Sequence, residues 1–448
     1  MITTTDHEIP LAPGGLPVLG HALALARNPF AFLSSLPAYG DLVRLRLGPQ
    51  TVIMICAPDL TREMLTDDRT FDKGGPFYDR AREASGDGLV TCPHALHRRQ
   101  RRLCQPAFRS QHFPAYTAAM VTSARDTAQS WRDGQIVDVN HATLTITMRA
   151  MVKAMFATQL SAEKEQEITD DLTVATGGIF RRMLTPPRLN RVPTPNNLRY
   201  NRAQARLRQT IADAVSSRRA GRADQGSLLA ILLEAKDPEN AGGLSALSDN
   251  EVAEQVLTFF LAGAETTANL LAWTLYELGR APDIQEHLHS HTVHVLHGRP
   301  ASFTLLPELT VADQVATEAL RMYPSAWFLT RTVATDAHLG DVPLPAGTTL
   351  AYSAYLIQRR PDLYPNPDRF DPDRWEGRKP DRTAYIPFGA GARKCIGDKF
   401  AHTQAALSLA TMTAMWRFVP LDDQIPRPAV HATLMPRGLR MKVVARQP

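Results

Sequence analysis

Apolar residues recur along this chain mainly at the spacing of an α-helix. The clearest helical pattern starts after Ser248 and continues to Gly279, and it contains an apolar run from Leu257 to Leu278. Ser248 and Glu251 match a capping box, in which each side chain bonds the backbone of the other residue at the start of a helix. We therefore predict a helix of about thirty residues, roughly 45 Å long at 1.5 Å per residue.

The apolar run in this helix is long enough to be compared with a membrane span. It carries Glu265 near its middle, and a charged residue at a bilayer centre costs about 2.5–3.5 kcal/mol. A helix buried in the core is therefore the simpler interpretation. Residues 1–10 are polar, so we predict neither a signal peptide nor a membrane anchor.

The remaining patterns predict a mainly α fold with a small β portion. Residues 42–57 alternate apolar positions with Arg44 and Arg46, turn at Gly48-Pro49 and continue into a second apolar strand, which predicts a β-hairpin. Further strands are predicted near 348–352 and 439–444. Two more helices are expected, one over 310–323, which must end before a proline, and one directly after Cys395.

Two other segments carry turn-forming residues. Residues 71–90 mix Phe77 and Tyr78 with glycines, and we predict a mobile loop that forms a wall over a pocket. The stretch from 117 to 217 is mainly helical, with a proline-rich break at 185–195.

Composition favours one large soluble domain. A length of 448 residues alone would suggest about three domains. No repeat, low-complexity tract or charged linker divides the chain, so we predict a single domain over 1–448 with a proline-rich segment at 1–20. The formal net charge of +5 is modest, and the basic residues are not interleaved with aromatic ones, which argues against nucleic-acid binding.

The four cysteines form no C-x-x-C pair, which indicates a reducing cytoplasm. Cys395 differs from the others because glycines flank it at 389, 391 and 397. Glycine allows backbone conformations that turn amide groups toward the sulfur. A helix start and basic neighbours favour the thiolate, which is the form that binds metals.

The spacing around this cysteine is F-x-x-G-x-R-x-C-x-G, and it resembles the haem-thiolate loop of the cytochrome P-450 family. The residues that carry this resemblance are Phe388, Gly391, Arg393, Cys395 and Gly397. The resemblance implies a cytochrome P-450 fold, with the haem between the long central helix and the cysteine loop. Cys395 would then be the axial ligand of the iron.

Other motifs of the same family follow in order. Residues 262–267, A-G-A-E-T-T, match its oxygen-binding helix, although close helix packing would explain them equally well in isolation. The resemblance implies that Ala262 and Gly263 lie near the cofactor and that Thr266 and Glu265 deliver protons. It also implies a buried structural network made by Glu318, Arg321 and Arg374.

The family places haem-propionate ligands at His97, Arg101 and Arg331. His97 and Arg101 are four residues apart and share a helix face, which in isolation would indicate only a solvated basic surface. Three nearby arginines are expected to point outward or toward a redox partner: Arg98, Arg99 and Arg102.

The resemblance implies a monooxygenase that uses haem b (iron protoporphyrin IX) and O2. We find no flavin or iron–sulfur cysteine pattern, so electrons from NAD(P)H would arrive through a separate ferredoxin and ferredoxin reductase. Two alternatives are a haem-thiolate isomerase or dehydratase that does not use O2, and a non-catalytic haem sensor. The intact 262–267 motif argues against the first, and the lack of an output domain argues against the second.

The positions at which this family lines its substrate pocket are uncharged here, which predicts a neutral, mostly hydrocarbon substrate such as a terpene. The stretches FDKGGPFYDRAR and RRQRRLCQPAF further resemble those of actinobacterial sesquiterpene oxidases. The expected pocket residues are Phe77, Tyr78, Phe259, Leu261, Ala262, Trp327, Phe328, Leu329, Leu434 and Met435.

Overall fold

The computed structural model describes residues 9–156, 161–185, 187–220, 226–240, 245–421, 426, 428–430 and 433–446. The chain divides into two compact units. The first unit takes its described residues from Met1–Asp79, Arg321–Phe370 and Gly377–Cys395, and the second from Arg80–Leu320, Asp371–Glu376 and Ile396–Pro448. The expectation of one domain over the whole chain stays a prediction.

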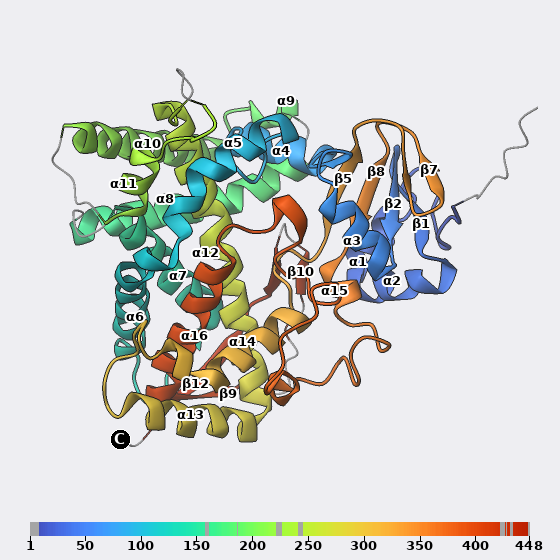
Figure 1. Ribbon diagram of the computed structural model, residues 1–448. Helices are drawn as coiled ribbons and strands as arrows, with labels where there is room; N and C mark the ends of the chain where they lie inside the picture. The colour runs from blue at the N-terminus through green and yellow to red at the C-terminus, as the bar shows by residue number, and fades with distance from the viewer. Residues whose placement is uncertain are drawn as a thin grey trace, which may run out of the picture. The chain divides into compact units, whose positions relative to one another are not determined.

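A five-stranded sheet organises the first unit, in the order β1-β2-β8-β5-β3 (Figure 1). The predicted hairpin is confirmed: Leu42 pairs with Ile55, and Gly48 at the turn has a φ of 61°. The strands of this sheet are β1 (Leu42–Leu47), β2 (Gln50–Ile55), β3 (Phe71–Asp72), β5 (Leu329–Val333) and β8 (Thr349–Tyr352).

Apolar side chains from this sheet form one core together with the short helices of the first unit, and Ile55 and Leu350 lie at its buried centre. A second hairpin joins β6 (Ala337–Leu339) to β7 (Val342–Leu344). The helices of this unit are α1 (Ala22–Arg27), α2 (Pro29–Ser35), α3 (Pro58–Thr66) and α15 (Ala354–Ile357).

The second unit is mainly helical, with α12 packed against α7, and α6 packed against both α7 and α16 (Figure 1). Its described strands form a sheet in the order β4-β12-β9 and a hairpin of β10 and β11. The helices are α5 (His94–Cys104), α6 (Phe113–Gln129), α7 (Val139–Phe156), α8 (Ala162–Leu184), α9 (Pro187–Asn190), α10 (Pro195–Arg219), α11 (Leu228–Glu234), α12 (Asp249–Arg280), α13 (Pro282–Leu296) and α16 (Asp398–Met415). The strands are β4 (Ile136–Asp138), β9 (Trp416–Pro420), β10 (Pro428–Val430), β11 (Leu434–Pro436) and β12 (Arg440–Ala445). A further helix, α14 (Thr310–Met322), begins in the second unit and ends in the first.

The long helix α12 begins as its sequence predicts. The Ser248 hydroxyl accepts from the backbone of Glu251, and the Glu251 carboxylate accepts from the backbone of Ser248. The helix is long and apolar enough to cross a membrane, but 72% of its most apolar window is buried inside the protein. This burial explains the apolar run as the core of the second unit.

The prediction of a loop over residues 71–90 is wrong in part, because α4 (Pro76–Ser85) occupies its middle. Pro76 stands at the first helical position, where its fixed φ suits a helix and its missing N–H costs no hydrogen bond. Gly86 follows the last turn with a φ of 76°, a conformation that glycine adopts readily. These end signals were present in the sequence among glycines that favoured a loop.

The segment after α4 is held against α12. The backbone N–H of Leu89 donates to the buried Gln255 side chain at 3.0 Å. Gly88 lies so close to α12 that an added Cβ would be 1.9 Å from the Thr258 hydroxyl oxygen and 3.0 Å from the Glu254 carbonyl oxygen. Contacts at Gly88 and Leu89 therefore hold this segment against α12, and the mobile wall expected over residues 71–90 stays a prediction.

We predict that Gly88→Ala lowers the free energy of unfolding by about 1–3 kcal/mol, because the added methyl group overpacks this contact. Gly177→Ala is the matched control, since an added Cβ on that residue of α8 has no atom within 4 Å. The control should raise stability by about 0.5–1 kcal/mol, because alanine favours the helix over glycine. Urea unfolding of both variants measures the difference, and equal stability of Gly88→Ala and the wild type would contradict the close packing.

Candidate functional site

The cysteine loop of the first unit turns sharply before Cys395. The backbone N–H of Cys395 donates to the Phe388 carbonyl at 2.9 Å, which closes the turn. Gly389 and Gly391 have φ angles of 68° and 67°, and an L-residue with a side chain is strained in that region. A Cβ on Gly391 would also lie 2.1 Å from the Leu65 carbonyl oxygen. The glycines predicted from the sequence are therefore required by the shape of the loop.

The buried side chain of Arg393 holds this loop in place through two ion pairs. Its side chain is almost fully buried, and it bonds Asp68 at 3.2 Å and Asp72 at 2.6 Å. Two carboxylates thus neutralise a guanidinium that would otherwise be costly to bury. Sequence reasoning assigned Arg393 to the cofactor and did not find these two aspartates, which precede it by more than 300 residues.

Cys395 is the exposed member of the four cysteines, all of which lie in the described part of the chain. Cys56, Cys92 and Cys104 are buried. Burial raises the pKa of the Cys56 and Cys104 thiols to about 12, so both stay neutral at physiological pH. The structure therefore presents one cysteine sulfur outward, on the loop that the sequence singled out.

Arg321 ties irregular segments of the first unit together. Its guanidinium is fully buried and donates to the carbonyls of Gln358 at 3.0 Å and Pro367 at 2.8 Å. The Gln358 side chain donates to the Arg321 carbonyl at 2.9 Å and accepts from the Ile386 N–H at 2.8 Å. Gln358 therefore links Arg321 to the segment that leads into the cysteine loop. No motif in the sequence marks this glutamine.

Glu318 is a buried charged residue of the second unit that bonds several neighbouring groups. Its carboxylate is fully buried and lies 3.6 Å from the Arg374 guanidinium, as the Glu-Arg-Arg pattern predicts. It also accepts from the Trp375 indole N–H at 2.9 Å and from the Asp371 backbone N–H at 3.1 Å. Two hydrogen-bond donors and the Arg374 charge therefore surround one buried carboxylate, and of these three groups sequence reasoning identified only the arginine.

Arg331 and Tyr78 meet inside the first unit. The Arg331 guanidinium lies 3.5 Å from the Tyr78 hydroxyl, donates to the Thr330 carbonyl at 3.0 Å, and stands over the Tyr352 ring. Burial raises the pKa of the Tyr352 hydroxyl to about 12, although the nearby Arg331 charge opposes this effect. The predicted pocket residue Tyr78 is thus buried beside a predicted propionate ligand.

The other predicted pocket positions of the first unit lie just before β5 and at its first residue. Trp327 is buried, with ring contacts to Phe30 and Phe328, and Phe328 and Leu329 are half-buried. The side chain of Phe77 lies outside the described residues.

The 262–267 motif lies in the middle of α12. The hydroxyls of Thr266 and Thr267 donate to the carbonyls of Ala262 and Gly263, at 2.7 Å and 2.9 Å. An added Cβ on Gly263 would lie 2.5 Å from the Met151 methyl group of α7, so the small residue permits close packing of these helices. The Glu265 carboxylate accepts a hydrogen bond from the Thr433 hydroxyl, a contact that no sequence signal indicated.

The remaining predicted pocket residues of the second unit are partly or fully buried. Phe259 packs edge-on against Phe108, with ring centres 5.2 Å apart, inside the core of this unit. Leu261 packs against the same core, Leu434 is buried in β11, and Met435 beside it is half-buried.

His97 and Arg101 both lie on α5, as predicted. His97 is buried, and the Arg101 guanidinium donates to the Gln105 side chain at 3.1 Å. Gly397 precedes α16, and an added Cβ there would stay 3.7 Å from the Phe108 ring. The roles predicted for these three residues stay predictions.

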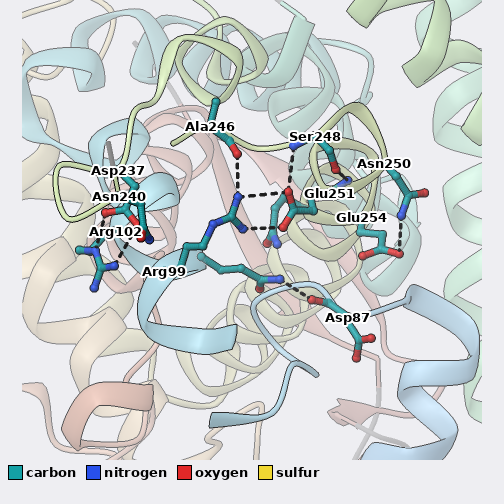
Figure 2. Close-up of polar contacts among 12 residues, drawn as sticks. Asp87, Arg99, Arg102, Asp237, Asn240, Ala246, Ser248, Asn250, Glu251 and Glu254 are labelled. Atoms are coloured by element: carbon teal, nitrogen blue, oxygen red, sulfur yellow. Dashed lines mark hydrogen bonds and ion pairs between the residues drawn. The ribbon is translucent and has the colours of Figure 1, made fainter. Parts of the chain in front are cut away.

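The outward orientation expected for Arg99 and Arg102 is wrong. Figure 2 shows Arg99 between the Glu251 carboxylate and the Ala246 carbonyl, at 2.5 Å and 2.6 Å. Arg102 donates twice to the Asp237 carboxylate, both times at 2.9 Å. Both arginines therefore attach α5 to the segment that leads into α12, whereas Arg98 is exposed as expected.

Asp237 should make the protein sensitive to acid. Hydrogen bonds from Arg102 hold the pKa of this carboxyl well below its usual range. The stabilisation is therefore present above the ordinary aspartate pKa of about 3.9, and it is lost as the pH falls through the lower native pKa. We predict that Asp237→Asn lowers the free energy of unfolding at pH 7 and weakens the further loss of stability in acid.

Unfolding titrations in urea at a series of pH values measure this effect. Asp126→Asn is the control, because Asp126 is half-exposed and lies 3.9 Å from Arg125, and such surface pairs contribute little. An Asp237→Asn variant with the acid profile of the wild type would contradict the assignment.

Comparison with known proteins agrees with this geometry. Residues 10–443 match the family model described as cytochrome P-450. The chain is 43% identical to pentalenene oxygenase of Streptomyces avermitilis, over 98% of this chain and 97% of the relative. It is 42% identical to cyclooctat-9-en-7-ol 5-monooxygenase of Streptomyces melanosporofaciens, over 92% and 89% of the two chains, and 40% identical to cyclooctatin synthase of the same organism, over 96% and 94%.

Proposed function

Because the chain belongs to the cytochrome P-450 family of haem-thiolate monooxygenases, we propose that Cys395 binds the iron of haem b (iron protoporphyrin IX) and that the substrate is a terpene. The observation that carries the first part is the exposed cysteine on a loop held by Gly389 and Gly391 at positive φ. Thiolate is the cysteine form that binds metals. The buried Cys56 and Cys104, with their raised pKa values, do not offer it.

Several basic side chains are proposed to hold the cofactor. His97, Arg101 and Arg331 are the proposed partners of the two propionates, since each supplies N–H donors for a carboxylate. Arg393 has five N–H donors and can bond a propionate in addition to Asp68 and Asp72. The proposed backbone contacts are at Phe388, Gly391, Gly397, Ala262 and Gly263.

The reaction consumes O2, two electrons and two protons, places one oxygen atom in a C–H bond of the substrate, and releases the other as water. A thiolate-bound haem, when present, supplies the oxygen-activating chemistry. The protein must supply the protons, and we assign this role to Thr266 with Glu265. Thr266 donates its own proton to Ala262, so its oxygen is oriented to accept one.

Electrons would come from NAD(P)H through a separate ferredoxin and ferredoxin reductase, because the sequence contains no flavin or iron–sulfur pattern. We place the protein in the cytoplasm, where its thiols would stay reduced.

The substrate assignment rests on the relatives and on the predicted pocket residues. The relatives include a pentalenene oxygenase and a cyclooctat-9-en-7-ol 5-monooxygenase. None of the proposed pocket side chains is charged. Such a site gains about 25 cal/mol per Å² of apolar surface buried, and it offers nothing to offset the desolvation of an ionised ligand.

Replacing the cysteine tests the cofactor assignment. Cys395→Ala should abolish the thiolate absorption signature of the reduced protein with carbon monoxide, because no sulfur remains to bind the iron. Cys92→Ala, which removes a buried thiol, should keep that signature. A Cys395→Ala variant with an unchanged spectrum would overturn the assignment.

Ligand titration tests the substrate class. We expect sesquiterpene hydrocarbons, pentalenene first, to shift the haem spin state, and fatty acids and amino-acid derivatives to have no effect. With ferredoxin, reductase and NAD(P)H, labelled O2 should then place one labelled atom in the product. Binding of a charged ligand without any response to hydrocarbons would refute the terpene proposal.

A further inference from the structure

One face of α12 holds the start of strand β11 at three successive turns. Glu265, Asn269 and Trp273 are spaced four residues apart, so they line one side of the helix. Asn269 donates to the Thr433 hydroxyl oxygen at 3.0 Å, and the Trp273 indole N–H donates to the Leu434 carbonyl at 3.1 Å. The Glu265 carboxylate completes the row by accepting from Thr433.

The direction of these hydrogen bonds follows from the donors available. A carboxylate can only accept, so the single hydroxyl proton of Thr433 is committed to Glu265. The Thr433 oxygen then accepts from the amide of Asn269, which is 3% exposed and has the N–H groups to donate. Thr433 therefore has one arrangement that satisfies both neighbours, and this arrangement fixes where the Glu265 carboxylate lies.

The contact also joins two parts of the proposed site. Thr433 directly precedes Leu434 and Met435, two of the expected substrate contacts. The Trp273 bond and a 2.5 Å bond from the Asn140 side chain to the Pro436 carbonyl hold this strand on either side of Met435. The segment that carries the substrate contacts therefore also carries the hydroxyl that orients the acid.

We propose that Thr433 is a positioning residue for proton delivery: it holds Glu265 in the orientation from which the acid serves Thr266, and it links that orientation to the substrate-contacting strand. The proposal rests on the proposed monooxygenase function. Glutamate has several rotatable bonds, so an unheld carboxylate would sample other orientations and deliver protons less reliably. Electrons would then be lost to peroxide without forming product.

Thr433→Val tests this role, because valine keeps the shape of the side chain and removes the hydroxyl. The holoenzyme is assayed with ferredoxin, reductase, NAD(P)H and the sesquiterpene that shifts the spin state most. We expect product formed per NAD(P)H to fall about threefold to tenfold, less than the roughly 100-fold typical of losing a proton-transfer group itself. Peroxide should rise correspondingly, while the substrate dissociation constant stays within about twofold.

Two variants separate positioning from simple support of the strand. Thr433→Ser keeps the hydroxyl and should retain the wild-type product yield. Trp273→Phe removes the neighbouring bond to Leu434 without touching Glu265, so it should weaken substrate binding and keep the yield. A wild-type yield in Thr433→Val, or an equal loss of yield in Trp273→Phe, overturns the proposal.

A double-mutant cycle provides a readout that does not depend on activity. Urea unfolding of Thr433→Val, Glu265→Ala and the double variant should give non-additive changes, because both substitutions remove the same bond. Additive changes overturn the contact. Thr433→Ala replaces Thr433→Val in both experiments if the valine variant does not fold.

Assays of the wild-type protein distinguish a failure of the proposed function from a failure of the role proposed for Thr433. A wild-type protein without O2-dependent product would refute the proposed function. A productive wild type together with an equally productive Thr433→Val would refute only the role of Thr433.

Discussion

Buried charge is the constraint on which the irregular parts of this protein depend. Loops have no ladder of backbone hydrogen bonds to hold their shape, whereas a buried guanidinium or carboxylate is costly unless neighbouring groups bond it. Arg321 donates to carbonyls of the segment 358–369, and Arg393 bonds Asp68 and Asp72. The charge therefore fixes the backbone around it. Removing one partner of such a network typically costs about 3–5 kcal/mol, because the remaining charge is left buried and unpaired.

Helix α12 has the same organising role in the second unit. Its first turns hold α5 and the segment after α4 through Glu251, Gln255 and Thr258. Its middle carries the threonines and the acid proposed for proton delivery, and the face that includes Glu265 and Trp273 holds β11. One helix thus contacts several segments that are distant in sequence.

In the proposed function, charged residues and substrate-contacting residues have separate roles. The charged groups that we propose to bind propionates or to move protons are distinct from the expected substrate contacts, which carry no charge. A hydrocarbon substrate offers no polar group by which it can be oriented, so shape must select the carbon that is oxidised. In this proposal, Thr433 orients the Glu265 carboxylate, and the next two residues, Leu434 and Met435, contact the substrate. One short segment of the chain therefore has both roles.

The sequence by itself determined the features that depend on neighbouring residues. The capping box of α12, the β1–β2 hairpin and the glycine-rich cysteine loop are local, and their signals lie within a few positions of the structure they produce. The family resemblance added the Glu318–Arg374 pair, because motif spacing carries information about distant contacts. Only the tertiary structure decided that Arg102 pairs with Asp237, Arg99 with Glu251 and Thr433 with Glu265, across 135, 152 and 168 residues. A surface arginine and a buried one look alike in sequence, and they differ physically only once folding has brought a distant partner within hydrogen-bonding distance.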